Sequence, residues 1–126
     1  MGGKKRTVFH EIVKSPEHWD EIVEKSANGG PIAVVDCHLD WCGPCQPMVP
    51  NYQTLFFSYE DPENRIGFWQ YPESAMSDEM KEKLQLSIIP RYLVVANGAI
   101  QVEIKGAMYV DLVQAIDSHI PEGPED

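Results

Sequence analysis

The spacing of apolar residues along the chain predicts strands that alternate with helices. Residues 7–13 carry the β-branched and aromatic side chains that are typical of a strand. Ser15-Pro16-Glu17 then provides a helix start, with a capping serine, a proline at the first helical position and an early acid. An apolar stripe with helical spacing begins at Trp19, and Asn28-Gly29-Gly30 ends it.

The middle of the chain continues this alternation. The apolar run over residues 32–37 is typical of a strand covered on both faces of a sheet, and open α/β sheets place their sites at the carboxyl ends of such strands. A helical stripe follows over about residues 43–59, with a kink expected at Pro50. Residues 66–70 predict a short strand, and Ser77-Asp78-Glu79 caps a further helix.

The last third of the chain predicts a hairpin and a terminal helix. Residues 92–96 and 99–105 are strands joined by Asn97-Gly98, a strong hairpin signal, and an apolar stripe over 109–120 indicates an amphipathic helix. The order β-α-β-α-β-α-β-β-α predicts an α/β fold in which helices flank a central mixed sheet on both faces. We expect one domain over residues 1–120 and a short acidic C-terminal tail over 121–126.

Composition and charge restrict the classes of partner. With 126 residues and 43% hydrophobic positions, the chain can bury a core as a single domain. Its formal net charge of −10 argues against nucleic acid or an anionic membrane as a partner, because both require a basic face. No apolar run approaches the length of a membrane span, and no secretory signal is recognisable, so we expect a cytoplasmic protein.

One pentapeptide, Trp41-Cys42-Gly43-Pro44-Cys45, carries the candidate chemistry. Two thiols two residues apart at a strand–helix junction indicate a dithiol/disulfide redox pair. The positive end of the following helix would stabilise a thiolate at Cys42. Gly43 allows a tight turn, and Pro44 fixes φ where the helix can dispense with an N–H group. The use of only three cysteines suits a reducing compartment.

A zinc site is the main alternative for the two thiols. A structural zinc ion needs four ligands, and the sequence has no second pair of cysteines or histidines at ligand spacing. Cys37 and His38 are close by, but adjacent strand residues point to opposite faces. We therefore expect no metal and no cofactor, a buried structural Cys37, and a His38 that lies in a loop or at the rim of the site.

Together with these elements, the motif makes the chain similar to the thioredoxin family over nearly its whole length, which implies a thioredoxin fold. Further positions match features of that family: the buried aspartate, the kinking proline of the active-site helix, the Ile–cis-Pro pair facing the cysteines, the hairpin turn, and a glycine near the substrate groove. These positions are Asp36, Pro50, Ile89-Pro90, Asn97-Gly98 and Gly106.

This resemblance implies a catalytic mechanism. Cys42 would attack a protein disulfide as a thiolate, and Cys45 would resolve the mixed disulfide. Asp36, desolvated beneath the pair, would have a raised pKa and move the proton of Cys45. The substrate-binding residues implied are Trp41, Gly43, Pro44, Ile89, Pro90 and Gly106. The partners implied are protein disulfide substrates and a thiol reductase that recycles the protein.

Several departures from the family pattern lie near the motif. The strand over 66–70, whose Phe68 and Trp69 are expected in the core, lacks the lysine that usually pairs with the buried aspartate. Gln46 stands where the family usually has a basic residue. Arg91 stands where a small residue often follows the cis-proline, and it either adds charge and bulk to the groove or pairs with an acid. These differences favour a specialised client over a generic one.

A subgroup of the family shares two further features. Lys4-Lys5-Arg6 before a strand and Trp19-Asp20-Glu21 in the first helix resemble the thioredoxin modules of ciliary proteins, among them the thioredoxin-type light chains of axonemal outer-arm dynein. The resemblance implies a redox-active light chain that contacts dynein heavy or intermediate chains in the axoneme of a cilium or flagellum. The alternative is a free cytosolic thioredoxin that acts as a general protein disulfide reductase.

Overall fold

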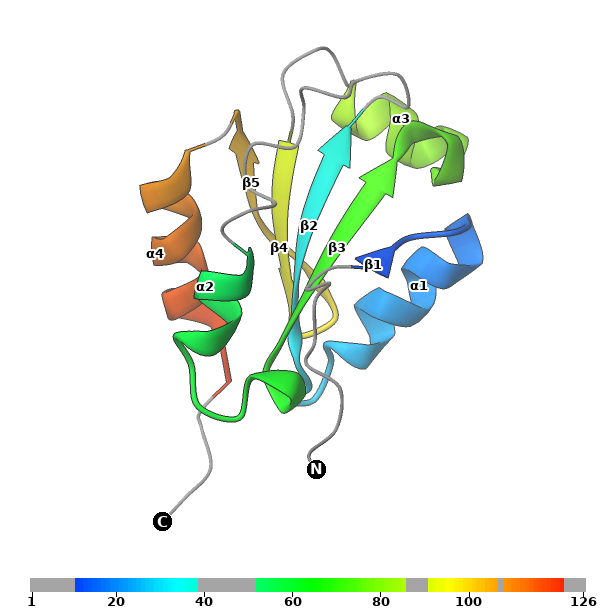
Figure 1. The fold of residues 1–126 in the computed structure, drawn as a ribbon. Coiled ribbons are helices and arrows are strands. Elements are labelled where there is room, and N and C mark those ends of the chain that lie inside the picture. Colours follow the sequence, from blue (N-terminus) through cyan, green and yellow to red (C-terminus); the bar gives the residue numbers. More distant parts are fainter. Residues whose placement is uncertain (1–10, 39–51, 86–90, 107, 122–126) are drawn as a thin grey trace, which may run out of the picture.

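The computed structural model of the chain describes residues 11–38, 52–85, 91–106 and 108–121. Within these residues the helices and strands are, in order, β1 (Glu11–Ile12), α1 (Pro16–Lys25), β2 (Ile32–His38), α2 (Tyr52–Phe57), the 3-10 helix η3 (Pro62–Asn64), β3 (Ile66–Pro72), the 3-10 helix η4 (Glu73–Ala75), α3 (Asp78–Leu84), β4 (Arg91–Ala96), β5 (Ala99–Lys105) and α4 (Tyr109–His119). The predicted alternation, with a hairpin before the last helix, is confirmed (Figure 1).

The described strands form one mixed sheet in the order β1-β3-β2-β4-β5. Strand β3 runs parallel to both β1 and β2, whereas β4 runs antiparallel to β2 and to β5. Parallel neighbours need a crossover connection and antiparallel neighbours a hairpin, so this topology follows from the order of elements along the chain. The sheet predicted from the sequence is confirmed.

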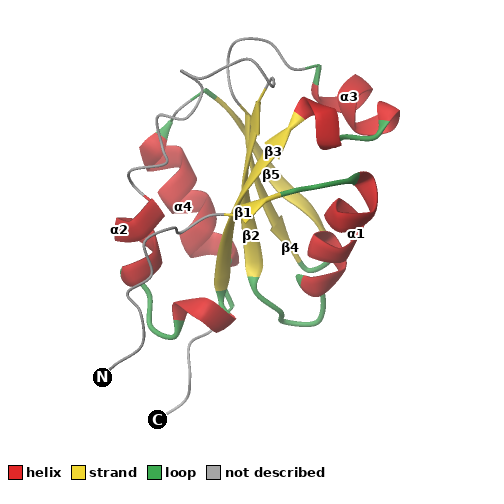
Figure 2. Cartoon of the chain, turned by 45° about the vertical axis from the view of Figure 1, so that its right-hand side comes forward, coloured by secondary structure: helices red, strands yellow, loops and turns green. Residues whose placement is uncertain are grey.

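Strand β2 lies at the centre of the sheet and is buried along its whole length. Its alternate side chains enter two different cores. Ile32 and Val34 join the cluster that includes residues of α2 and α4, whereas Ala33 and Val35 join the cluster that includes residues of α1 and α3. Figure 2 shows the two pairs of helices on opposite faces of the sheet. The continuous apolar run of β2 is therefore explained by cover on both faces.

Helix α1 begins as the sequence predicts. The Oγ of Ser15 accepts a hydrogen bond from the backbone N–H of His18 at 3.0 Å, and Pro16 occupies the first turn. At the other end of the helix, the buried Ser26 donates its hydroxyl to the carbonyl of Val23 and accepts from the N–H of Gly98 at 3.0 Å. Ser26 therefore joins the end of α1 to the turn between β4 and β5, a role that the sequence did not indicate.

Three strands are longer than predicted, and β2 is one of them, since it ends at His38 rather than at Cys37. Strand β3 continues to Pro72 rather than ending at Gln70, because Tyr71 remains paired with Cys37 of β2 and is fully buried. Strand β4 begins at Arg91, one residue earlier than predicted, since this residue pairs with both neighbouring strands. The part of the first predicted strand before Glu11 lies outside the described residues.

Two helices end earlier than predicted. Helix α2 ends at Phe57, and the hydroxyl of Tyr59 beyond it donates a hydrogen bond to Asp117 of α4. Helix α4 ends at His119, because Ile120 has the extended backbone that a following proline favours. Pro50 and the predicted helix before Tyr52 lie outside the described residues.

Candidate functional site

The predicted cysteine pair and most of its predicted substrate-binding residues lie outside the described residues: Trp41, Cys42, Gly43, Pro44, Cys45, Ile89 and Pro90. The structure describes the strands to which these segments are attached. His38 ends β2 before the cysteine segment, and Arg91 begins β4 directly after Pro90. Because Cys37 pairs with Arg91, both segments join neighbouring strands at the same end of the sheet.

Asp36 is the predicted catalytic residue that the structure describes. Its side chain is fully buried on β2, with 0% exposure. It shares a face of the strand with Val34, so it lies on the side of the sheet that α2 and α4 cover. Burial of a carboxyl group near the end of the strand that leads to Cys42 agrees with the sequence-based expectation. The catalytic role of Asp36 stays a prediction.

Two buried polar residues flank Asp36 in the neighbouring strands. Gln70 of β3 and Tyr92 of β4 are in register with it, and both are buried. The Nε2 atom of Gln70 has no hydrogen-bond partner within the described part of the chain. Strand β3 lacks the lysine that usually pairs with the buried aspartate, and Gln70 is its residue beside Asp36. Because the amide of Gln70 is uncharged, it cannot stabilise the Asp36 carboxylate as a lysine would.

Sequence reasoning did not single out Gln70 or Tyr92 as part of the site. The alternation of side chains along β3 does indicate Gln70, because Ile66, Phe68 and Gln70 share one face and Gln70 is the polar residue among them. That Gln70 and Tyr92 both lie beside Asp36 depends on the register of the strands, which cannot be read from the sequence.

Cys37 points to the opposite face of β2 and is fully buried as a free thiol. Burial raises the pKa of this thiol well above its ordinary value. The carboxylates of Asp36 and Glu103 raise the pKa further, and the guanidinium of Arg91 opposes them. A buried thiol that keeps its proton is a poor nucleophile, so the expected structural role of Cys37 agrees with its position.

The raised pKa of Cys37 predicts a loss of stability at alkaline pH. As pH rises past the ordinary thiol pKa of about 8.5, the unfolded chain releases this proton while the folded chain retains it. The unfolded state then binds fewer protons, so the free energy of unfolding falls by up to about 1.4 kcal/mol per pH unit. Urea titrations between about pH 8 and pH 10 should show a shallower pH slope in Cys37→Ala than in the native protein. Equal slopes would contradict this assignment.

Arg91 forms an ion pair with Glu103, and the two sequence-based alternatives for it can now be compared. Its Nε lies 3.2 Å from the Oε2 of Glu103 on the adjacent strand β5. The expectation that Arg91 pairs with an acid is thus confirmed.

His38 differs from its expectation: it is buried, with 7% exposure, at the end of β2, because β3 continues beside it as far as Pro72.

Gly106 lies directly after β5 at the same end of the sheet. Its neighbour Lys105 pairs with Arg91, which follows the predicted Ile89-Pro90 pair. Gly106 has a φ of +85°, a conformation that favours glycine, and its carbonyl accepts a hydrogen bond from the N–H of Met108 at 2.9 Å. The backbone therefore needs glycine here, whereas substrate binding by Gly106 stays a prediction.

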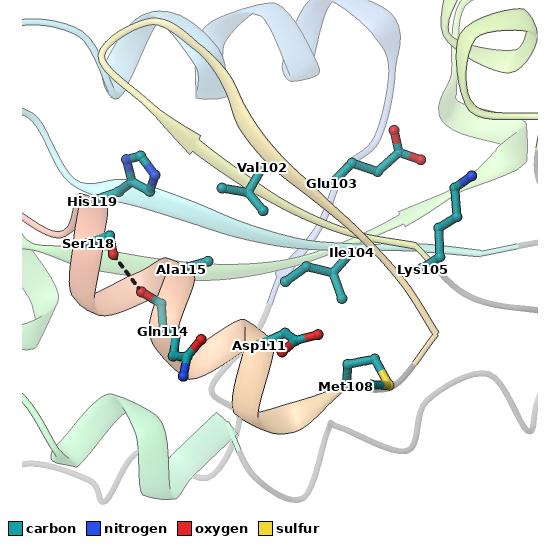
Figure 3. Close-up of a pocket in the computed structure, with 10 residues that line it drawn as sticks. All are labelled: Val102, Glu103, Ile104, Lys105, Met108, Asp111, Gln114, Ala115, Ser118 and His119. Carbon is teal, nitrogen blue, oxygen red and sulfur yellow. Dashed lines mark hydrogen bonds between the residues drawn. The ribbon is translucent and has the colours of Figure 1, made fainter.

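An open groove of about 590 Å³ lies between β5 and α4, beside Gly106. Val102, Ile104 and Ala115 give it apolar walls (Figure 3). Met108, which is 52% exposed, lies at one end of the groove, and His119 lies toward the other. The groove extends the surface around Gly106 along the edge strand of the described sheet.

The described residues offer neither a metal centre nor a membrane-spanning helix. Within them, no group of three or more histidine, cysteine, aspartate or glutamate side chains could hold a metal ion. Their helices are also too short or too polar to cross a membrane.

Comparison with known proteins identifies the family. The sequence model of thioredoxin matches residues 10–118. A chloroplastic F-type thioredoxin of Brassica napus is 30% identical over 92 residues, which are 73% of this chain and 48% of that protein. Mouse thioredoxin domain-containing protein 6 is 30% identical over 110 residues, 85% of this chain and 30% of that protein. The chain spans about half the length of the first of these relatives.

A solved structure confirms the fold. The crystal structure of thioredoxin NaTrxh from Nicotiana alata superposes with a TM-score of 0.69 over 94% of this chain and 99% of that chain, at 21% sequence identity. The five-stranded mixed sheet with helices on both faces is therefore a thioredoxin fold, as the sequence predicts. Because the family model covers most of the sequence, including all the strands described above, the chain belongs to the thioredoxin family.

Proposed function

We propose that the chain is a dithiol–disulfide oxidoreductase that acts on protein disulfides through Cys42 and Cys45. The observation that carries this proposal is the intact cysteine pair, which follows the central strand β2 in a member of the thioredoxin family. The buried Asp36 near the end of that strand adds support, because proton transfer next to the thiols needs a titratable group in their vicinity.

The proposed reaction has two exchange steps. The Cys42 thiolate attacks one sulfur of the substrate disulfide, forms a mixed disulfide and releases the other substrate sulfur as a thiolate. The Cys45 thiolate then attacks the Cys42 sulfur, releases the second substrate thiol and leaves a Cys42–Cys45 disulfide. The substrate gains two electrons and two protons. A thiol reductase returns the protein to its dithiol form.

Turnover of a model substrate tests this proposal. The reduced protein should accelerate the reduction of insulin disulfides by a chemical dithiol, because each cycle transfers two electrons through the cysteine pair. Precipitation of the insulin B chain or consumption of the reductant measures the rate. The proposal fails if the native protein shows two titratable vicinal thiols and still gives no rate above the reductant alone.

For its setting in the cell, we propose a light-chain subunit of an axonemal outer-arm dynein, which contacts heavy or intermediate chains. The similarity of Lys4-Lys5-Arg6 and Trp19-Asp20-Glu21 to ciliary thioredoxin modules supports this setting. Trp19 also has a structural role, since it stacks on Tyr71 with ring centroids 4.6 Å apart. The uncharged Gln70 beside Asp36 adds support, because it departs from the usual pattern of the family.

Fractionation separates the light-chain setting from the alternative of a free cytosolic thioredoxin. The light-chain setting predicts that the native protein remains with the motor complex through high-salt extraction of axonemes. Recovery only as a monomer in the soluble fraction would favour the general disulfide reductase. This result is independent of the insulin assay, because a light chain can retain a working cysteine pair.

A further inference from the structure

The surface between α1 and β3 holds an open groove that the proposed redox reaction does not use. Its volume is about 610 Å³, and its described lining residues are His18, Glu21, Ile22, Glu24, Lys25 and Trp69. Helix α1 lies across the sheet from α4 and from the groove of Figure 3 (Figures 1 and 2). A partner in this second groove would leave the surface around Gly106 open.

Trp69 is the central feature of the groove. It packs against the core cluster that includes residues of α1 and α3, as the sequence predicts, but it is not fully buried. Its side chain is only half-buried, and its ring meets that of His18 edge-on, with centroids 5.2 Å apart and an interplanar angle of 81°. The indole lies over Gly67, where an added Cβ would come within 3.3 Å of its Nε1.

Acidic side chains outnumber basic ones around this ring. Glu21 and Glu24 are exposed on α1 and form no ion pair within the described chain. A smaller cavity of about 170 Å³ shares Ile22, Lys25 and Trp69 with the groove, and Glu11 also lines it. Among the described residues that line the two cavities, Lys25 is the only lysine, and there is no arginine. Two exposed carboxyl groups of α1 and one ammonium group therefore line the groove beside the partly buried Trp69.

We propose that this groove binds a basic, arginine-containing segment of a partner polypeptide. A guanidinium group can stack on the indole of Trp69 while its N–H groups donate to the carboxylates of Glu21 and Glu24. Arginine suits the site better than lysine, because its planar and weakly hydrated group both stacks on rings and binds carboxylates. The net charge of −10 steers such a segment toward the protein and repels acidic partners.

The geometry selects this partner over others. An acidic segment or a nucleic acid would meet the carboxylates of Glu21 and Glu24 on a chain of net charge −10 and would be repelled. An apolar helix would have to desolvate the charged groups of Glu21, Glu24 and Lys25 beside Trp69 and Ile22. Aromatic and arginine side chains also supply much of the binding energy in protein interfaces, which fits an arginine anchored on Trp69.

Titration with an N-acetylated hexaarginine amide at low ionic strength tests the proposal. Calorimetry should show one saturable site, and the indole N–H resonance of Trp69, assigned by its loss in Trp69→Leu, should shift in proton–nitrogen NMR spectra. The affinity should fall about tenfold in Trp69→Leu and about tenfold in the double variant Glu21→Gln, Glu24→Gln. A hexalysine amide should bind more weakly than the hexaarginine amide.

A matched charge control makes the test decisive. The double variant Glu79→Gln, Glu82→Gln removes the same two charges from exposed positions on α3, outside the groove. It should retain nearly the native affinity. Equal weakening of both double variants, unchanged affinity in Trp69→Leu, or the absence of saturable binding would overturn the proposal. Insulin reduction by the glutamate variants should equal that of the native protein. An inactive cysteine pair with intact peptide binding would overturn only the proposed redox function.

Discussion

Replacing Cys42 with serine is expected to reduce insulin turnover to the uncatalysed background. Disulfide exchange requires a thiolate as nucleophile, and a serine hydroxyl with its far higher pKa cannot attack a disulfide sulfur in its place. Cys45→Ser should behave differently, because Cys42 can still attack but the mixed disulfide has no resolving thiol. A substrate disulfide should then remain covalently attached to the protein, which non-reducing electrophoresis and mass spectrometry detect.

Cys37 provides a matched control within the same chain. It is the third cysteine, it lies five residues before Cys42, and its side chain is fully buried with a raised pKa. Cys37→Ala should therefore retain turnover per folded molecule, although it loses some stability. Retained turnover in Cys42→Ser would exclude the proposed nucleophile. Loss of turnover in folded Cys37→Ala would show that the chemistry depends on a thiol outside the pair.

Much of the fold could be predicted because its signals are local. The capping serine and proline at 15–16, the continuous apolar run of β2 and the Asn97-Gly98 turn each report a backbone preference within a few residues. The ends of elements were less predictable. Strand β3 extends to Pro72 because Tyr71 pairs with Cys37, a residue far away in the sequence.

The chemistry of the site could also be predicted in part. A pair of cysteines at this spacing is a local motif, and the burial of Asp36 followed from the resemblance that the motif established. Gln70 and Tyr92 could not be identified in the same way, because they adjoin Asp36 only through the register of three strands. The partial burial of Trp69 likewise depends on how α1 lies over the sheet.

Leu112→Ala is expected to be the most destabilising of the substitutions considered. Leu112 is fully buried in α4 and belongs to the cluster that also contains Val34 and Tyr92, next to Asp36 in the sheet. Truncation removes apolar contacts and leaves a cavity in a closely packed core, at a cost of about 2–5 kcal/mol. At about 4 °C per kcal/mol for a domain of this size, Tm should fall by roughly 10 °C or more. Thermal and urea unfolding followed by circular dichroism measure both quantities.

Val110→Ala supplies the control from the same helix. Val110 is 65% exposed and lies two positions before Leu112, so its truncation opens no cavity and should change the unfolding free energy by no more than about 0.5 kcal/mol. Both substitutions introduce alanine into α4, and the different helix propensities of leucine and valine account for no more than about 0.7 kcal/mol of any difference between them. Equal urea midpoints for the two variants would mean that α4 is not anchored through Leu112 on the face that buries Asp36. A large difference instead ties the environment of Asp36 to the packing of the last helix.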